Sequence, residues 1–447
     1  MTDAAAGPAA AAERAPITHR RVLHIAVPIV LSNATVPILG AVDTGVVGQM
    51  GAAAPIGAVG IGAVILSAVY WIFGFLRMGT TGMVAQAKGA GDVAETGALL
   101  TRGLMVGLVG GVVLVALQAL IFWGAFRLAP ASDEVETLAR QYLSIRIWGA
   151  PAAIGIYALT GWLIGMERTR GVLMLQLWMN GLNIGLDLWF VLGLGWGVGG
   201  VATATLIAEW SGLALGLWLC RGAFTGHQWR DWPRVFDPVR LKRMLQVNAD
   251  IMIRSVLLTG SFMTFLFLAA DLGDVTLAAN QVLIQFLEIT AFALDGFAFA
   301  AEALVGTAVG ARNRADLRRS AIIASQWGVG GAVMMGAIYW LFGGAIIDLM
   351  TTSDAVRAEA RSYLPWLVLA PALGVASWMY DGIFIGATWT RQMRGAMFEA
   401  VAIYVVALAI FLPWLGNHGL WLSLIVLNIA RAATLARRYP RLEAAVV

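Results

Sequence analysis

The sequence predicts an all-α integral membrane protein with twelve transmembrane helices, arranged as two parallel-repeat six-helix lobes around a central cavity. The first observation is composition: of 447 residues, 60% are hydrophobic and 13% are charged, whereas a soluble domain usually carries about 25% charged residues. The second is that the apolar residues fall into runs long enough to span a membrane, which takes roughly 20 residues. The third is an internal repeat. Duplicated bundles are common in secondary transporters, which hold the substrate between related halves.

The repeat is carried by matched residues at one constant offset. Ser132-Asp133 recurs as Ser353-Asp354, and the run from Ala139 to Leu143 recurs from Ala360 to Leu364. The glycine pair that follows is also repeated, as Gly161, Gly165 and Gly382, Gly386. Each half holds an even number of spans, so both halves insert with the same orientation and the repeat is parallel.

Each half is expected to contribute six spans. In the first half they are 22–46, 54–84, 100–126, 138–164, 172–194 and 199–220. In the second half they are 243–270, 277–306, 319–345, 361–386, 394–414 and 418–435. The expected domains are a disordered cytoplasmic N-terminus (1–17), an N-lobe (18–220), a cytoplasmic linker (221–242), a C-lobe (243–436) and a cytoplasmic tail (437–447).

Loop charges predict the orientation. Positive residues collect on one side of the expected membrane, for example Arg168, Arg170 and the linker arginines, while the opposite turns are nearly free of charge. The protein is expected in the plasma (inner) membrane. The positive-inside rule then places both termini and the linker in the cytoplasm. The basic residues are interpreted as topology and lipid-headgroup contacts rather than nucleic-acid binding.

Acids inside the spans are the main functional candidates, because a carboxylate in hydrocarbon is costly and usually marks an ion path. Asp43 is the only acid of the first span, which also contains Pro28 and Pro37. These prolines remove backbone donors and are expected to let the helix bend. A bendable helix with an acid that a proton can neutralise is a candidate two-state element. The alternative is that Asp43 is simply hydrated near the outer end.

The fifth span adds Asn180, Asn183 and Asp187. Asn183 and Asp187 are four residues apart and share a helical face, so they can share a proton network or supply oxygen ligands to a small cation. Thr205 of the sixth span, with Thr203, can join them. The structural alternative is interhelical hydrogen bonding.

Further charged residues are candidates for the cavity wall or for gating. Arg77 needs a carboxylate partner that the sequence does not identify, and a structural ion pair is expected. Asp250 and Arg254 are four apart, so we expect them to pair with each other, with a gate as the equal alternative. The full set is Arg77, Asp250, Arg254, Gln281, Glu288, Asp295, Glu302 and Asp381. Glu288, Asp295 and Glu302 are spaced by seven, which predicts one polar stripe.

Other chemistry is disfavoured. One cysteine, Cys220, excludes an intramolecular disulfide and a cysteine-based metal site. The four histidines lie at span ends or in loops, so we expect no enzyme, no metal site and no cofactor other than a coupling ion. The 17 Met, 18 Phe and 18 Trp residues suit amphipathic or cationic small molecules. We expect such substrates and membrane lipids as the only partners, no nucleic acid, and a functional monomer.

Four stretches resemble the multidrug and toxic compound extrusion (MATE) family, in its DinF-like branch. They begin at Val42, Phe75, Leu294 and Asp381. The resemblance implies the MATE fold and multidrug efflux of cationic or amphipathic compounds by alternating access, as drug:H+ antiport. It also implies a coupling site that maps onto Asp43, Asn180, Asp187 and Thr205. Asp250 lies too early in its span for the second-lobe cation site of other branches, which favours H+, although Na+ remains possible. The alternatives are a Na+-coupled drug antiporter and a lipid-linked oligosaccharide flippase of related fold.

Overall fold

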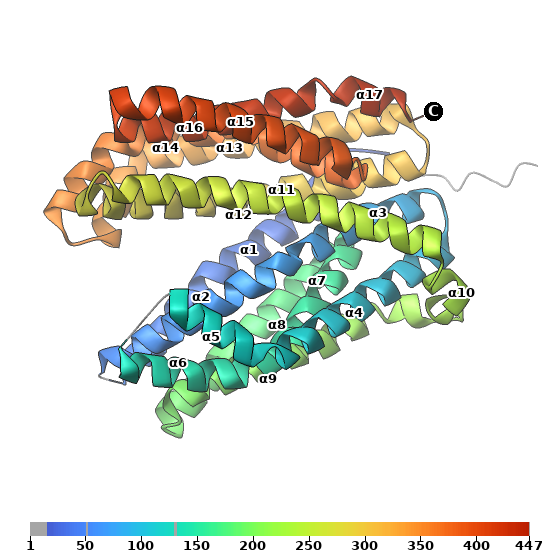
Figure 1. Ribbon diagram of the computed structural model, residues 1–447. Coiled ribbons are helices and arrows are strands. Elements are labelled where there is room, and N and C mark those ends of the chain that lie inside the picture. The colour runs from blue at the N-terminus through green and yellow to red at the C-terminus, as the bar shows by residue number, and fades with distance from the viewer. Residues whose placement is uncertain (1–15, 51, 129–131, 447) are drawn as a thin grey trace, which may run out of the picture.

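The computed structural model describes residues 16–50, 52–128 and 132–446, and these residues form helices and short connections with no strand (Figure 1). The predicted disordered segment 1–17 lies outside them except for its last two residues. In the first half the helices are α1 (His19–Gly48), α2 (Ala53–Trp71), α3 (Phe75–Gly89), α4 (Val93–Ala116), α5 (Gln118–Leu128), α6 (Asp133–Arg146), α7 (Ala150–Gly165), α8 (Thr169–Asp187) and α9 (Gly197–Leu219).

Short helical turns join several of these helices into longer rods. A 3-10 turn, Ile72–Gly74, connects α2 to α3, and another, Ile147–Gly149, connects α6 to α7. A π-helical turn, η3 (Leu188–Gly193), continues α8. The second half contains α11 (Pro238–Ala270), α12 (Asp274–Gly310), α13 (Arg314–Met350), α14 (Asp354–Gly386), α15 (Thr390–Leu415), α16 (Asn417–Ala436) and α17 (Tyr439–Ala444).

Ten of these helical segments, within the described residues, are long and apolar enough to cross a membrane. The other two predicted spans are α1, of 30 residues, and α8 with η3. Both are helical as predicted, and both carry the polar residues that the sequence singled out. The all-α, two-lobe membrane architecture is therefore confirmed.

The helix α11 begins at Pro238, inside the predicted linker 221–242. Asp237 caps this helix by accepting hydrogen bonds from the amides of Val239 and Arg240, and proline is favoured just after such a cap. The remaining linker contains the short helix α10 (Trp232–Val235) and is docked on α4. Thr101 donates to the Trp229 carbonyl, and Arg102 donates to the carbonyls of Arg234 and Val235.

The repeat found in the sequence corresponds to matched helix crossings. α6 begins at Asp133 and α14 begins at Asp354. A Cβ on Gly161 would lie 2.5 Å from the Arg77 carbonyl oxygen, and a Cβ on Gly382 would lie 2.5 Å from that of Ala298. Glycine is needed at both positions because the two backbones approach too closely for a side chain.

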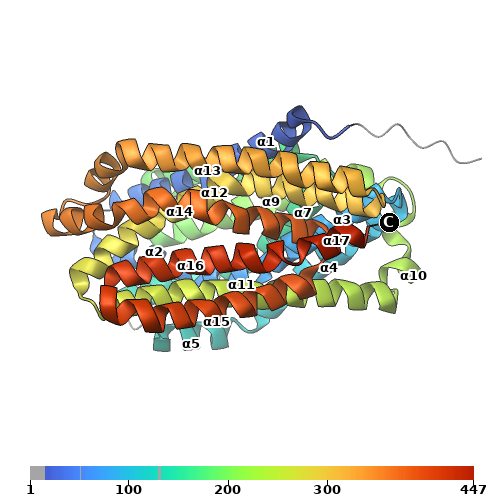
Figure 2. The same ribbon diagram turned by 90° about the horizontal axis from the view of Figure 1, so that it is seen from above.

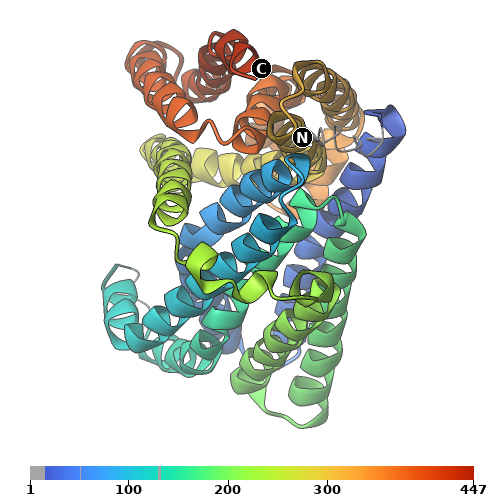
Figure 3. The ribbon, with the colours of Figure 1, turned by 90° about the vertical axis from the view of Figure 1, so that its right-hand side faces the viewer.

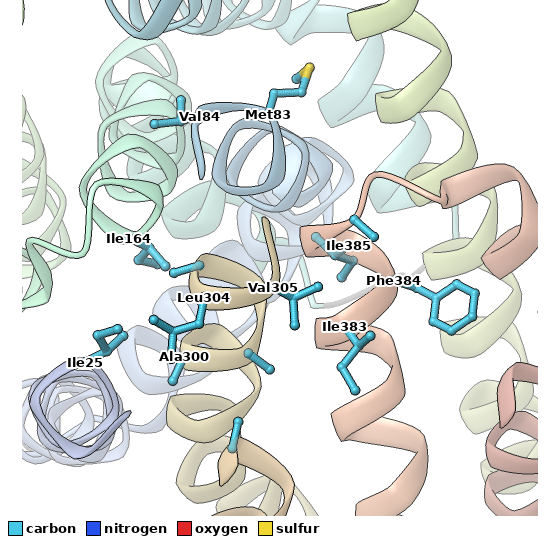
Figure 4. Packing of buried hydrophobic residues seen from close by; sticks show 14 of the residues in the cluster. Ile25, Met83, Val84, Ile164, Ala300, Leu304, Val305, Ile383, Phe384 and Ile385 are labelled. Atoms are coloured by element: carbon cyan, nitrogen blue, oxygen red, sulfur yellow. The ribbon is translucent and has the colours of Figure 1, made fainter. Parts of the chain in front are cut away.

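The lobes meet at one end of the molecule, here called the α10 end, where α10, α17 and the start of α1 lie (Figures 1 and 3). Near that end a shared core joins α1, α3 and α7 of one lobe to α12 and α14 of the other (Figure 4). Along α1 the contact with α12 extends to Asn33, whose amide donates to the Phe292 carbonyl at 3.0 Å. Beyond it Val36 and Ile289 are 42% and 44% exposed, and the lobes diverge.

Candidate functional site

Asp43 of α1 and Asp187 at the end of α8 lie together inside the N-lobe, on helices that pack side by side. Asp187 is fully buried and Asp43 is half-buried. The two carboxyl groups are close enough to share a hydrogen bond. A hydrogen bond between two carboxyl groups needs a proton, and two adjacent carboxylates repel each other strongly. The predicted cation-coupling acids are thus brought into direct contact.

Asn183 links this acid pair to α9. Its amide nitrogen donates to Asp43 Oδ1 at 3.2 Å and to Asp187 Oδ2 at 3.3 Å. Its amide oxygen accepts from the hydroxyl of Thr205 at 3.0 Å and from the Thr205 backbone amide at 3.2 Å. The side chain of Asn183 is 1% exposed, so these contacts satisfy a buried polar group. Asp187 Oδ1 has no hydrogen-bond partner among the described residues.

Asn180 belongs to a second polar chain one turn away. Gln176 donates to Asn180 Oδ1 at 3.0 Å, and Asn180 donates to Thr35 Oγ1 on α1 at 2.7 Å. Thr35 in turn donates to the Ser32 carbonyl at 2.7 Å. Asn180 is therefore close to the acid pair in the fold but hydrogen-bonds to α1 rather than to the acids. The sequence analysis missed Thr35, although its place between two helix prolines could have indicated it.

The helix changes character directly after Asp187. The next residues form the π-helical turn η3, and single π turns are frequent at functional sites. The turn leads to Gly195 and Gly197, which adopt positive φ angles of 68° and 58°. Asp187 is thus the last residue of regular α-helix before an irregular segment.

A buried ion pair lies near the acids. Arg146 of α6 and Glu209 of α9 are 2.7 Å apart, and both side chains are at least nine-tenths buried. The positive charge of Arg146 acts electrostatically on both Asp43 and Asp187. A Cβ on Gly149 would overlap the Glu209 carboxylate, so a larger residue there would displace one partner of this ion pair. The sequence analysis missed Arg146, whose signal was a cation inside a predicted span.

Arg77 finds its partner across the lobe boundary. Its guanidinium on α3 is 3.3 Å from Glu302 on α12 and lies 3.8 Å over the ring of Phe299. The expected structural ion pair is therefore present, and it connects the lobes. Glu302 is 2% exposed, so losing Arg77 would leave a buried charge unpaired.

The predicted acidic stripe on α12 divides into three environments. Glu302 is paired, Asp295 lies within electrostatic reach of Arg77 and Arg254, and Glu288 is exposed with no ion-pair partner among the described residues. Gln281, seven residues before Glu288 on the same helix, is also exposed. The stripe runs from the lobe contact to the diverging end.

The expected pairing of Asp250 with Arg254 is wrong. Asp250 pairs with Arg394 at 2.6 Å and accepts from Thr390 at 3.0 Å, both on α15. Arg254 pairs instead with Asp381 on α14. The reason is that each side chain faces a different neighbouring helix, and a partner far along the chain packs closer than the one four residues away.

Asp381 is shared by two cations. Besides Arg254 it pairs with Arg431 of α16, which also donates to Asn428 Oδ1 at 2.8 Å. Arg431 is 3% exposed and Asp381 is 7% exposed. The sequence analysis missed Arg431. Asp381 is thus placed inside the C-lobe, between guanidinium groups.

The two prolines lie inside α1, which continues through them. Pro28 cannot donate to the His24 carbonyl, and that oxygen accepts instead from Thr169 Oγ1 on α8 at 3.3 Å. The proline therefore creates a polar contact between the two helices that carry the acid pair. Among the described residues, no three His, Cys, Asp or Glu side chains converge as a metal site would require.

Comparison with known proteins agrees with this architecture. The chain matches the MatE family model over residues 28–189 and 251–412. It is 38% identical, over 94% of its length and 91% of the relative's, to DNA damage-inducible protein F of Escherichia coli. It is 27% identical to the probable multidrug resistance protein NorM of Rhizobium meliloti, over 94% of this chain and 92% of that protein.

Solved structures share the fold. An outward-facing multidrug resistance MATE family transporter superposes with a TM-score of 0.86 at 20% identity, over 95% of this chain and 96% of that chain. A MOP superfamily transporter from Pyrococcus furiosus gives 0.83 at 21% identity, with the same coverage. The two-lobe helical bundle, the matched family model and the relative at 38% identity together show that this chain belongs to the MatE family of membrane transporters.

Proposed function

We propose that this efflux transporter exports cationic or amphipathic compounds in exchange for protons, and that Asp43 and Asp187 carry the exchanged proton. The observation that carries the proposal is the adjacent carboxyl pair of Asp43 on α1 and Asp187 on α8, with Asn183 beside both acids. A site of this kind binds a proton or a positive substrate but not both, because either one neutralises the same charge. The relative named as a probable multidrug resistance protein supports the substrate class.

The amide orientation of Asn183 that best satisfies its neighbours suits H+ as the coupling ion. Its amide nitrogen faces both acids, and its oxygen is occupied by Thr205. Sodium, like calcium and magnesium, needs oxygen ligands directed at the ion. To provide one, Asn183 would have to reverse its amide, which keeps a hydrogen bond to the Thr205 hydroxyl at 3.0 Å but gives up the bonds that Asn183 donates to the acids. A proton shared between the acids requires no such change.

In the proposed orientation the protein lies in the plasma (inner) membrane, and the α10 end faces the cytoplasm together with both termini. Arg168, Arg170 and the linker arginines supply positive charge to the loops of this end, as the positive-inside rule requires. The lobes are joined at the α10 end and diverge at the other, so this arrangement corresponds to an outward-facing state of a monomeric carrier that needs no cofactor.

The proposed cycle follows from competition for one charge. A proton arriving from outside neutralises the acid pair, and the exported compound leaves. The lobes then separate at the α10 end and release the proton to the cytoplasm. The recharged acids select the next cation. Binding of proton and compound are thus coupled by their mutual exclusion.

Flux measurements in proteoliposomes test this proposal. Ethidium, a fluorescent lipophilic cation, would serve as the probe, with a pH gradient and a Na+ gradient imposed separately. The wild type should move ethidium under the pH gradient alone. Asp43→Asn and Asp187→Asn should each abolish this flux while the protein remains folded.

A matched control is Asp354→Asn, since that side chain is 97% exposed at the start of α14. It should transport normally. Flux driven only by the Na+ gradient would show that the coupling ion is Na+ rather than H+. Normal proton-driven flux in Asp43→Asn would show that the acid pair does not carry the exchanged proton. The fold assignment would be unaffected.

A further inference from the structure

A long groove lies on the C-lobe, away from the acid pair, between α13, α14 and α17. Its volume is about 580 Å³. Its walls are mostly apolar and include Ile322, Val329, Met379 and Ile383. Ile322 and Val329 are 48% and 47% exposed. A groove with such walls on a membrane-spanning helix faces hydrocarbon, so it can hold an alkyl chain.

One end of the groove is polar and basic. Arg318 precedes the groove on α13, and the series Arg318, Ile322, Ser325, Val329 follows one face of the helix. The Arg318 side chain is exposed, and its guanidinium has no ion-pair or hydrogen-bond partner among the described residues. Tyr439 lines the same groove, and the charges of Glu443, which pairs with Arg314, and of Arg318 both act on it. The cation therefore stands at the mouth of the groove, with apolar residues beyond it.

The helix α17 closes this basic end. Arg314 of α13 is 3.4 Å from Glu443 of α17, and the rings of Tyr380 and Tyr439 are 6.1 Å apart. Leu442 of α17 is fully buried. Figure 2 shows α17 at the α10 end, next to the bundle that carries α13 and α14. The wall near Arg318 is thus held in place rather than open to solution.

We propose that this groove binds one anionic phospholipid of the bilayer. An acyl chain lies along Ile322, Val329 and Ile383, and the phosphate lies beside Arg318 and the hydroxyl of Tyr439. Charge complementarity decides between occupants: an anionic headgroup satisfies the unpaired guanidinium, whereas a cationic compound at the same place would be repelled. The groove is polar at one end and apolar beyond it. A phospholipid has the same order, with its headgroup at the membrane surface and its acyl chains in the leaflet.

Native mass spectrometry of the purified protein in detergent tests this inference. Phosphatidylglycerol and phosphatidylcholine of equal chain length would be titrated onto the wild type. The wild type should bind phosphatidylglycerol more tightly. Arg318→Gln should lower that affinity about fivefold, the effect expected for one cation near a lipid phosphate, and leave phosphatidylcholine binding unchanged.

A second variant tests the apolar part. Val329→Trp fills the groove and should weaken binding of both lipids. Matched controls are Arg170→Gln, an exposed arginine of the other lobe, and Val405→Trp, whose valine is 56% exposed on α15. Both controls should bind lipids as the wild type does, and thermal unfolding should show all four variants folded.

Three results would overturn the inference. The wild type could bind the two lipids equally, Arg318→Gln could keep the preference, or Arg170→Gln could lose as much affinity as Arg318→Gln, which would indicate diffuse attraction to a basic surface. Displacement of the lipid by ethidium would assign the groove to exported compounds instead.

Discussion

Asn183 determines how the two acids are held. It contacts both carboxyl groups through one nitrogen and is itself fixed by Thr205. Without this donor, the buried acids would lose hydrogen bonds that are worth about 1.5–3 kcal/mol when they involve a charged group. The exchange of a proton should therefore depend on Asn183 and on the residue that orients it.

Asn183→Leu should reduce proton-driven ethidium flux at least tenfold, because the lost hydrogen bond contributes about 1.5–3 kcal/mol of free energy. Thr205→Val should reduce it less, because Asn183 remains but is free to turn. The control is Thr203→Val on the same helix, since the Thr203 hydroxyl donates to the Gly199 carbonyl of its own helix at 2.8 Å. Equal losses in the Thr203 and Thr205 variants would contradict this role of Thr205.

Glu167 provides a test of stability at the α10 end, outside the membrane spans. Burial raises the pKa of this carboxyl, but the hydrogen bond from Arg21 at 2.7 Å and the nearby charge of Lys88 at 2.8 Å outweigh it and hold the pKa below its usual value. A lowered pKa stabilises the folded protein above the unfolded-state value of about 4.3. The contribution is lost as the pH falls through the folded-state value.

Glu167→Gln should therefore cost about 2 kcal/mol of unfolding free energy at pH 7, and the difference from the wild type should shrink below about pH 4. Denaturation in detergent at both pH values measures it. Glu399→Gln, which breaks an exposed pair with Arg438, should cost less than about 1 kcal/mol. A Glu167 effect that persists undiminished at low pH would show that packing, not charge, is responsible.

The sequence singled out two acids that the fold brings together, but it did not identify the ion pairs. Asp43 and Asp187 stand out because isolated acids in apolar spans are rare, and Asn183 stands out by its spacing from Asp187. The partners of Arg77, Arg254 and Asp381 lie on other helices, so spacing within one span could not identify them. For the same reason Arg146 and Arg431 were missed.

At the scale of helices, α1 combines the features that a moving element needs. It carries Asp43, contains two prolines, and bonds to the other lobe through Asn33 in its first half. Pro37 lies one turn beyond Asn33. It lacks the donor that would bond the Asn33 carbonyl, so the helix is weakest where it leaves the C-lobe.

Pro37→Ala should restore a backbone hydrogen bond and stiffen α1. Ethidium flux should fall severalfold while the folded protein is as stable as the wild type or more so. Pro413→Ala is the matched control, because Pro413 also lies inside a helix, α15, at an exposed position. Unchanged flux in Pro37→Ala, or the same loss in both variants, would argue against bending at Pro37.

At the scale of the whole molecule, the α10 end is closed by a symmetrical crossing of α3 and α12. A Cβ on Gly89 would lie within 3.0 Å of the Thr307 carbonyl, and a Cβ on Gly310 would lie equally close to the Gln86 carbonyl. Polar contacts reinforce the closure: Arg240 pairs with Glu95, and Arg243 donates to Gln86 at 2.8 Å. The sequence predicted the two lobes and their repeat, but the close approach of these backbones depends on tertiary packing.

Gly310→Val should force the lobes apart at this end, because backbone atoms cannot move aside as a flexible side chain can. Arg170→Cys and Arg391→Cys, exposed in the two lobes, would carry spin labels in a Cys220→Ala background that lacks the native cysteine. The distance between the two labels would report the separation of the lobes. The distance should increase in Gly310→Val. Gly60→Val is the control, since nothing lies within 4 Å of its Cβ. An unchanged distance in a folded Gly310→Val protein would contradict the proposed closure.

The central claim is that the acid pair gives up a proton when a compound binds. Ethidium added to the purified protein in weakly buffered detergent solution near pH 7 measures this directly. The wild type should release about one proton per ethidium bound, by linkage between the two ligands, and the double variant Asp43→Asn, Asp187→Asn should release none. Binding by the wild type without proton release, or equal release by the double variant, would contradict the account.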